Sequence, residues 1–269
     1  MIGRLRLRAA YEHGRTVLRE VCCEFPLVLS RPRADSAGGW LSLVVLTPSG
    51  GLLDGDALES DVTIEAGAKL RLRAQAATQI HAGRSSQAWR FTVGADASLD
   101  YAPRALVPHA RAEHHSRVTA ELAPTGSLFV AESVTPGRCH LGEMFSYQEL
   151  RLDLDIQQNG LLAARERQVI RPEADALACQ LGPYSHFAAA YLFGTDQVRP
   201  PTCDGLEAGI TSLAYGGQCA RLLANRAIDL DRGLEDMALQ WRTQLEGSIP
   251  QLPCRNALSQ GRAVGRRAI

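Results

Sequence analysis

The chain has 269 residues, with 29 basic and 29 acidic side chains and a formal net charge of zero at pH 7. This length is enough to bury a substantial core, and the balanced charge gives no electrostatic reason to expect nucleic acid or an anionic membrane as partner. No window approaches 18 apolar residues, and the opening residues lack the apolar core of a signal peptide. We therefore expect a cytoplasmic protein without a membrane span.

The seven cysteines are scattered, and no Cys-x-x-Cys pair occurs. The adjacent residues Cys22 and Cys23 make a poor disulfide and an incomplete metal site. We expect reduced thiols and no structural zinc site.

The N-terminal segments predict β-strands. Residues Arg4–Arg8 alternate basic and apolar side chains, which is the period-two pattern of a strand with one buried face. A turn at Gly14, Arg15 and Thr16 precedes a returning strand. The apolar run Trp40–Leu46 predicts a buried strand that leads into the segment TPSGGLLDGD, residues 47–56.

The segment 47–56 combines glycines with closely spaced carboxylates directly after a strand. Pro48, Gly50, Gly51 and Gly55 supply turn conformations, because glycine tolerates positive φ. Two interpretations stay open. The segment is either a tight connection between strands, or a place where the backbone and Asp56 approach a ligand, a metal ion or a partner protein.

Three segments share one plan: an alternating strand, a turn of small residues, and a leucine that opens the next strand. Leu70, Leu99 and Leu128 are spaced 29 residues apart, and a fourth copy places Leu161 33 residues further on. Recurrence of this length indicates stacked β-units, and the alternative is an antiparallel meander with hairpins of similar length. We predict a mainly all-β fold of layered antiparallel strands, with solenoid-like repeats of about 29 residues.

Helical signals are confined to the last quarter of the chain. A first helix is predicted from Asp204 to the glycines at 216 and 217, and a second from Asp231 to Gly247, with a strand over Gln218–Asn225 between them. We expect a β-scaffold body over residues 1–200, a C-terminal α/β extension over 201–250 packed on the body, and a flexible tail over 251–269.

No motif of a catalytic site is present. The chain lacks a G-x-S-x-G elbow, a Walker A loop, an H-E-x-x-H helix and a Rossmann fingerprint. His114 and His115 cannot both face one metal from a strand, because neighbouring side chains point to opposite faces. His109 could share an ion with either of them across a hairpin, although the spacing does not demand it. We predict no catalytic residues and no stable metal site.

Two carboxylates lie in or beside apolar strands, Glu132 and Glu166. Such an acid costs several kcal/mol unless it is paired, hydrated or bound to a cation. One explanation is an ion pair with a nearby arginine, such as Arg138 for Glu132. The other is that Asp56, Thr78, Glu132 and Glu166 line one polar path, whose hard oxygen donors would bind a divalent ion such as Ni²⁺ weakly enough to release it.

Five segments follow one another in an order that resembles the urease accessory protein UreD (UreH) family: GRT, PSGGLLDGD, QAAT, LDYAPRALVPHARA and PGRCHLGE. The resemblance runs from about residue 3 to about residue 170 and thins afterwards. The positions that match the family's turns are Gly14, Arg15, Thr16, Pro48, Gly50, Gly51, Gly55, Asp56, Ala76, Ala77, Thr78, Gly137, Arg138 and Glu143.

This resemblance implies a non-enzymatic scaffold and nickel metallochaperone for urease maturation. Such a protein bridges the urease apoprotein to a complex of UreF and the GTPase UreG, and it assists nickel insertion during metallocentre assembly. GTP hydrolysis would take place on UreG. The resemblance further implies an all-β body with a small helical contribution, no tightly bound cofactor and only transient contact with Ni²⁺.

The sequence departs from the family pattern at several positions. Asp54 stands where the family usually has glycine, Gln79 where it has lysine, and His81 where it has an aromatic residue. The C-terminal signature is reduced to the residues PCRN at 253–256. These departures concern the contacts of the loop over 74–84 and of the C-terminus.

Two other functions stay open at this point. The chain could be a β-scaffold that only bridges proteins while nickel passes elsewhere, with its buried carboxylates serving structure. It could also be a metal-dependent hydrolase built on His81, His109 and Asp56.

Overall fold

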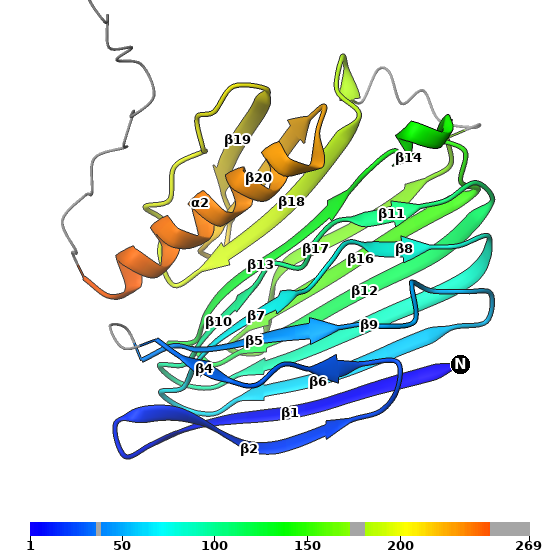
Figure 1. Cartoon of the computed structure of the whole chain (residues 1–269). Coiled ribbons are helices and arrows are strands. Elements are labelled where there is room, and N and C mark those ends of the chain that lie inside the picture. Colours follow the sequence, from blue (N-terminus) through cyan, green and yellow to red (C-terminus); the bar gives the residue numbers. More distant parts are fainter. Residues whose placement is uncertain (36–38, 173–180, 248–269) are drawn as a thin grey trace, which may run out of the picture.

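Two β-sheets packed face to face form most of the molecule, and one helix lies on the outer side of the second sheet (Figure 1). The computed structural model describes residues 1–35, 39–172 and 181–247. Over these ranges strands predominate, and α2 (Ala227–Leu245) is the one α-helix described. The predicted all-β class with a small helical C-terminal part is confirmed.

The first sheet, sheet A, has seven strands within the described residues, in the order β17-β16-β12-β9-β6-β1-β2. Its inner neighbours run parallel, and the outer strands β2 and β17 run antiparallel to the strands beside them. The strands of sheet A are β1 (Ile2–Glu12), β2 (Arg15–Cys23), β6 (Ala57–Ile64), β9 (Gly83–Val93), β12 (Ala112–Leu122), β16 (Glu149–Gln158) and β17 (Leu161–Ile170).

The second sheet, sheet B, follows the order β19-β20-β18-β13-β10-β7-β5-β3, with β4, β8 and β11 attached at its margins. A separate ribbon of β14 and β15 closes around the 3₁₀ turn η1. The remaining elements are β3 (Val28–Leu29), β4 (Arg33–Ala34), β5 (Leu41–Leu46), β7 (Lys69–Ala74), β8 (Thr78–Ile80), β10 (Ser98–Tyr101), β11 (Leu106–Pro108), β13 (Ser127–Val134), β14 (Gly137–Arg138), η1 (Cys139–Leu141), β15 (Glu143–Met144), β18 (His186–Phe193), β19 (Leu206–Ser212) and β20 (Gln218–Ala224).

The strands that carry the repeat run parallel, whereas the sequence predicted antiparallel layers. The chain crosses between sheet A and sheet B within each unit, so neighbours in one sheet come from successive units and point the same way. Leu70, Leu99 and Leu128 consequently stand in register on β7, β10 and β13. Parallel pairing also excludes the antiparallel meander for these strands.

The predicted fourth copy of the repeat is wrong. Leu161 opens β17, which folds back antiparallel on β16 and so remains in sheet A. The cause is the turn before it, where Asn159 and Gly160 have φ of 52° and 73°. This Asn-Gly pair with two positive φ angles is typical of a two-residue hairpin turn. The regular spacing therefore holds for three leucines and does not extend along the chain.

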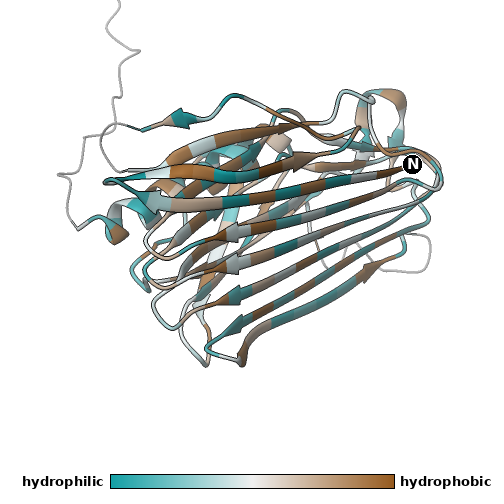
Figure 2. Ribbon diagram, turned by 90° about the horizontal axis from the view of Figure 1, so that it is seen from below, coloured by the Kyte–Doolittle hydropathy of each residue, from teal (hydrophilic) through white to brown (hydrophobic). Residues whose placement is uncertain are grey.

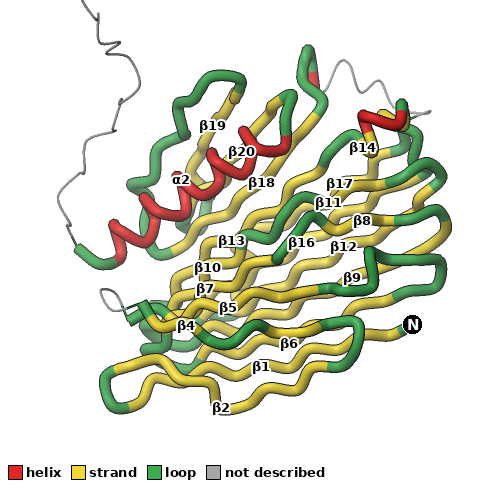
Figure 3. Tube along the Cα trace, viewed as in Figure 1, coloured by secondary structure: helices red, strands yellow, loops and turns green. Residues whose placement is uncertain are grey.

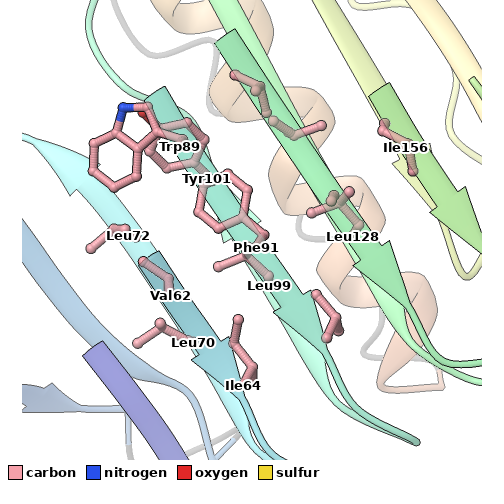
Figure 4. Close-up of a cluster of buried hydrophobic side chains, with 14 of the residues drawn as sticks. Val62, Ile64, Leu70, Leu72, Trp89, Phe91, Leu99, Tyr101, Leu128 and Ile156 are labelled. Carbon is pink, nitrogen blue, oxygen red and sulfur yellow. The ribbon is translucent and has the colours of Figure 1, made fainter. Parts of the chain in front are cut away.

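Hydrophobic and hydrophilic residues alternate along many of the strands (Figure 2). The hydrophobic side chains that point inward fill the space between the sheets with an apolar core (Figure 4). On β1, Leu5 and Leu7 are buried while the alternating Arg4, Arg6 and Arg8 are exposed, as the sequence predicted. Sheet A contributes Val62, Phe91 and Ile156, among others, and sheet B contributes residues such as Leu70, Leu72, Leu99 and Leu128. The core thus lies between the layers, so an acid on an inward-facing position is placed in apolar surroundings.

The helix α2 buries its apolar face on the outer side of sheet B. The Trp241 ring packs 6.0 Å from the Phe129 ring, and its indole N–H donates to the Phe193 carbonyl at 3.0 Å. The second predicted helix is confirmed, and it begins at Ala227, ahead of the predicted start at Asp231. The predicted strand before it is confirmed as β20.

The first predicted C-terminal helix is wrong, because β19 occupies that segment. β19 pairs antiparallel with β20 from Leu206 to Ser212. Leu206, Ala208 and Ile210 pack against the core under α2, which is the alternation of a strand. Completion of sheet B by this edge strand outweighs the helical signals of capping and spacing.

No helix of the described chain is long and apolar enough to cross a membrane. The predicted boundary at residue 200 stays a prediction, although β18 on one side of it pairs with β20 on the other. The predicted tail over 251–269 lies outside the described residues.

Candidate functional site

Four of the five sequence segments that carry the resemblance meet at one end of the sheets, the right-hand end in Figure 3. Leu52, in the glycine-rich segment, pairs with Ile80, and the His81 N–H donates to the Leu52 carbonyl at 2.9 Å. β8 pairs in turn with β11, where Leu106 lies opposite Thr78. We call this end of the molecule the rim.

Close backbone approach explains two of the rim glycines. A Cβ on Gly51 would lie 2.4 Å from the carbonyl oxygen of Gln79, and one on Gly137 would lie 2.3 Å from that of Glu143. Their φ angles are +132° and +121°, which side chains rarely allow. The glycine-rich turn is therefore a tight connection between strands. This agrees with the first of the two interpretations of segment 47–56.

The Gly14-Arg15-Thr16 turn lies away from the rim, at the opposite end of β1 and β2 (Figure 1). The Thr16 hydroxyl accepts the backbone N–H of Lys69 at 3.0 Å and donates to the Gly39 carbonyl at 3.1 Å. Thr16 thus ties the hairpin of sheet A to sheet B. Its contacts point to a structural role.

Arg138 pairs with Glu143, so it is not the arginine partner that one of the two explanations offered for Glu132. The guanidinium donates from Nε and Nη2 to the two carboxylate oxygens at 2.8 and 2.6 Å. Glu143 also accepts the Ala110 N–H at 3.2 Å. These bonds, with the Arg138 charge, hold the pKa of Glu143 below its usual value. The pair fixes the turn from β14 to β15 against the loop after β11.

A cavity of about 260 Å³ opens between the sheets behind the rim. Thr78 and Glu132 both line it, as do the aromatic rings of Trp89 and Tyr101, which pack 4.8 Å apart. The other polar side chains on its wall are Thr47, Arg73, Gln75, Gln79, Gln87, Arg104 and Ser133.

A second, narrow cavity of about 20 Å³ adjoins the wall at Glu132. It is lined by Glu132, Glu166, Gln168 and Tyr191 together with apolar side chains of β13, β16 and β18. Because Glu132 belongs to both cavities, it stands between Thr78 on one side and Glu166 on the other. Three of the four predicted path residues, Thr78, Glu132 and Glu166, therefore line these two adjoining cavities.

Among these three residues, Glu132 has the most unusual environment. It faces the intersheet core beside Leu128 and Val130, and it accepts a hydrogen bond from the Ser116 hydroxyl at 2.6 Å. Burial, together with the carboxylates of Glu166 and Asp153, raises the pKa of Glu132 to about 7 against the lowering effect of that bond. Among the described residues no basic side chain forms an ion pair with it. Its charge is therefore left to water or to a cation.

Glu166 has partners of its own. The Arg221 guanidinium donates to it at 2.9 Å, and the Tyr191 hydroxyl donates to its other oxygen. Burial and this carboxylate raise the pKa of Tyr191. An ion pair with arginine, one of the two explanations offered for such acids, thus applies to Glu166.

Asp56 lines neither cavity. Its carboxylate accepts the Leu53 N–H at 2.9 Å and pairs with the Met1 amino group at 2.7 Å. Burial favours a higher pKa for Asp56, but these two donors outweigh it and lower the pKa. The structure thus places Asp56 in the glycine-rich turn and apart from Thr78, Glu132 and Glu166.

The histidines form no large cluster. His114 faces inward and bonds Ser85 at 2.9 Å, whereas His115 faces outward and bonds Asp153 at 2.8 Å, so the predicted separation is confirmed. His109 instead lies against His81. Within the described chain no group of three or more His, Cys, Asp or Glu side chains is arranged to hold a metal ion.

Two polar residues beside Glu132, Ser116 and Gln87, were not predicted from the sequence. The Gln87 amide donates to Ser116 at 3.0 Å, so a chain of hydrogen bonds runs from the larger cavity to Glu132. The available signal was a polar residue on the buried face of an alternating strand, which Ser116 shares with Val118 and Ala120. Their proximity follows from the register of β9 and β12, where Gln87 lies opposite Ser116.

Comparison with known proteins adds a family relationship. A protein-family profile described as UreD urease accessory protein matches residues 1–257. The urease accessory protein UreD of Mycolicibacterium gilvum is 33% identical over 220 residues, 77% of this chain and 80% of the relative. UreD of Deinococcus radiodurans is 27% identical over 260 residues, 92% of each chain, and UreD of Acetivibrio thermocellus is 29% identical over 178 residues, 65% and 68% of the two chains. The similarity therefore extends beyond residue 170, where the sequence motifs thin out.

Proposed function

The chain belongs to the UreD family of urease accessory proteins, and on that premise we propose that it is a non-enzymatic scaffold through which nickel reaches urease. Family membership supports a role in urease maturation. The finer proposal is that the protein bridges urease apoprotein to UreF and the GTPase UreG in the cytoplasm, and that its interior carries Ni²⁺ between them.

The position of Glu132 between two cavities is the observation that carries the nickel proposal. A carboxylate that faces an apolar core without a basic partner is unfavourable, and a passing cation would offset that cost. Thr78, Ser116 and Gln87 add neutral oxygen atoms along the way. A few hard oxygen donors with exchangeable water would hold Ni²⁺ weakly, which suits cargo in transit.

A scaffold that only bridges proteins is the second candidate, and the narrow cavity favours it. A space of about 20 Å³ holds about one water molecule, so an ion could pass Glu132 only if side chains moved. The ion pair of Glu166 with Arg221 would also have to open. A hydrolase built on His81, His109 and Asp56 gains no support, because Asp56 is bound by the Met1 amino group and Leu53.

Replacement of Glu132 and Glu166 separates the two candidates. We would purify tagged wild type, Glu132→Gln and Glu166→Gln from cells that carry the whole urease operon. We would then measure the co-purified proteins and the nickel content of urease. Glu121→Gln is the matched control, since Glu121 lies on the exposed face of β12. The path proposal expects intact complexes and nickel-poor urease for the two variants and normal urease for the control.

Loss of complexes in proportion to lost activity would instead favour the bridging scaffold. If wild-type protein recovers neither UreF, UreG nor urease, and deletion leaves urease activity unchanged, the proposed function is wrong.

A further inference from the structure

His81 and His109 are brought together at the rim by parallel pairing of two short strands. Each follows its strand directly, His81 after β8 and His109 after β11, and the register places Pro108 opposite Ile80. The His109 N–H donates to the Ile80 carbonyl at 2.9 Å, and the His81 N–H donates to the Leu52 carbonyl at 2.9 Å. The ring centres lie 4.5 Å apart with the planes at 70°. These backbone hydrogen bonds thus fix the positions of the two Cα atoms from which the side chains project.

One nitrogen of each ring is occupied by an acceptor. His81 Nε2 lies 3.3 Å from the Gly50 carbonyl oxygen, and His109 Nε2 lies 2.8 Å from Gln79 Oε1. An oxygen acceptor requires the proton on Nε2, so the lone pair of a neutral ring is on Nδ1. Among the described residues neither Nδ1 has a hydrogen-bond partner, and neither is sealed from solvent. Both rings therefore offer a free, reachable ligand atom.

The surroundings of His109 favour its neutral form. Burial, the positive charge of Arg138 and the neighbouring His81 lower the pKa of His109, while Glu143 acts in the opposite direction. Imidazole must be deprotonated to bind a metal, and the lowered pKa of His109 favours that form. The Arg138 charge is balanced by its two bonds to Glu143, which limits its repulsion of an approaching cation.

We propose that His81 and His109 form a two-imidazole site for a divalent transition-metal ion at the outer mouth of the larger cavity. Ligand bonds of about 2 Å put two nitrogens on one ion within about 4 Å of each other, a separation close to the 4.5 Å between the two ring centres. Imidazole suits nickel, copper and zinc, and water completes the coordination.

The site adjoins the interior through its own hydrogen-bond partners. Gly50, which contacts His81, and Gln79, which contacts His109, both line the larger cavity. The assignment of nickel as the bound ion rests on the proposed function, since an ion captured here would next meet Thr78 and Glu132. Two protein ligands hold an ion more weakly than the three or four of a resident site, and an ion in transit must be released.

Binding of Ni²⁺ to protein without a polyhistidine tag tests the site. We would compare wild type with His81→Phe, which keeps the ring contact, and His109→Gln, which keeps an amide donor near Gln79. His13→Asn is the control. His13 lies in the turn between β1 and β2, at the end of these strands opposite the rim, and asparagine tolerates its positive φ. Titration calorimetry should show at least a tenfold weaker Kd for each rim variant and no change for His13→Asn.

A second measurement does not depend on how the variants fold. In wild-type protein, Ni²⁺ should broaden the NMR signals of the His81 and His109 rings before that of His13. Broadening that spares these two rings, or unchanged Kd in both rim variants, would overturn the proposal. Failure of the nickel path would appear separately, as normal nickel content of urease with Glu132→Gln while binding at the rim persists.

Discussion

Ser116 of sheet A donates a 2.6 Å hydrogen bond to Glu132 of sheet B, across the space between the two sheets. The bond favours the charged carboxylate, and burial favours the neutral one. Burial outweighs the bond, so this carboxyl group titrates near neutral pH. The same position that makes Glu132 a candidate for cation passage therefore makes it a source of pH-dependent instability.

We predict that Glu132→Gln stabilises the protein at alkaline pH. Folding raises the Glu132 pKa from 4.5 to about 7, so the folded chain holds more protons than the unfolded chain between these values. Stability then falls as pH rises through this window, by on the order of 3 kcal/mol. Glutamine keeps an acceptor for Ser116 and cannot ionise. Urea unfolding at pH 5 and pH 8 should show its advantage over wild type growing with pH.

The control for this pH effect is Glu121→Gln, on the exposed face of β12. Its stability should follow that of wild type at both pH values. An equal difference between Glu132→Gln and wild type at pH 5 and pH 8 would mean that Glu132 is hydrated or paired in solution.

The strand layout could be predicted from sequence only in part, and the repeat shows why. Spacing alone identified Leu70, Leu99 and Leu128 as equivalent, and they do stand in register. Spacing cannot report direction, because a hairpin and a crossover of equal length give the same period. At residue 159 the turn chemistry of Asn-Gly was the better guide, and it decides that β17 returns along β16.

The site shows a similar limit. An acid at Glu132 within an apolar strand is visible in sequence, but the choice between an arginine partner such as Arg138 and a polar path is not, and in the structure Arg138 pairs with Glu143 instead. Which groups surround it depends on partners far away in the chain, such as Ser116 and Glu166. The contact of His81 with His109 likewise depends on the pairing of β8 with β11, two strands of three residues each, too short for a periodic signal.

We predict that Gly51→Ala and Gly137→Ala each destabilise the protein by roughly 2–4 kcal/mol, because the new methyl group meets a backbone carbonyl and a strained φ. Gly209→Ala is the matched control, since a Cβ there meets nothing within 4 Å. Urea unfolding measures all three. A loss below 1 kcal/mol at both rim glycines would show that the junction of the glycine-rich turn with β8 relaxes easily.

We predict that Asp100→Asn loosens the attachment of α2. Asp100 is fully buried on β10, where Arg73 bonds it at 2.8 Å and Arg242 of α2 bonds it as well. Removal of this charge leaves two guanidinium groups facing each other with less compensation, and loss of one partner from a buried pair costs about 3–5 kcal/mol. Urea unfolding followed by tryptophan fluorescence should report the loss, because Trp241 lies in the same interface.

Asp61→Asn provides the comparison for Asp100→Asn. Asp61 pairs with Arg90 on the outer face of sheet A, where the two side chains are 42% and 53% exposed. Exposed ion pairs contribute about 0–1 kcal/mol, so this variant should unfold almost as wild type does. If both variants lose the same small amount, the arginines around Asp100 must reach water or Glu235 when the charge is removed, and the helix is then held by its apolar face and the ion pairs of Glu235.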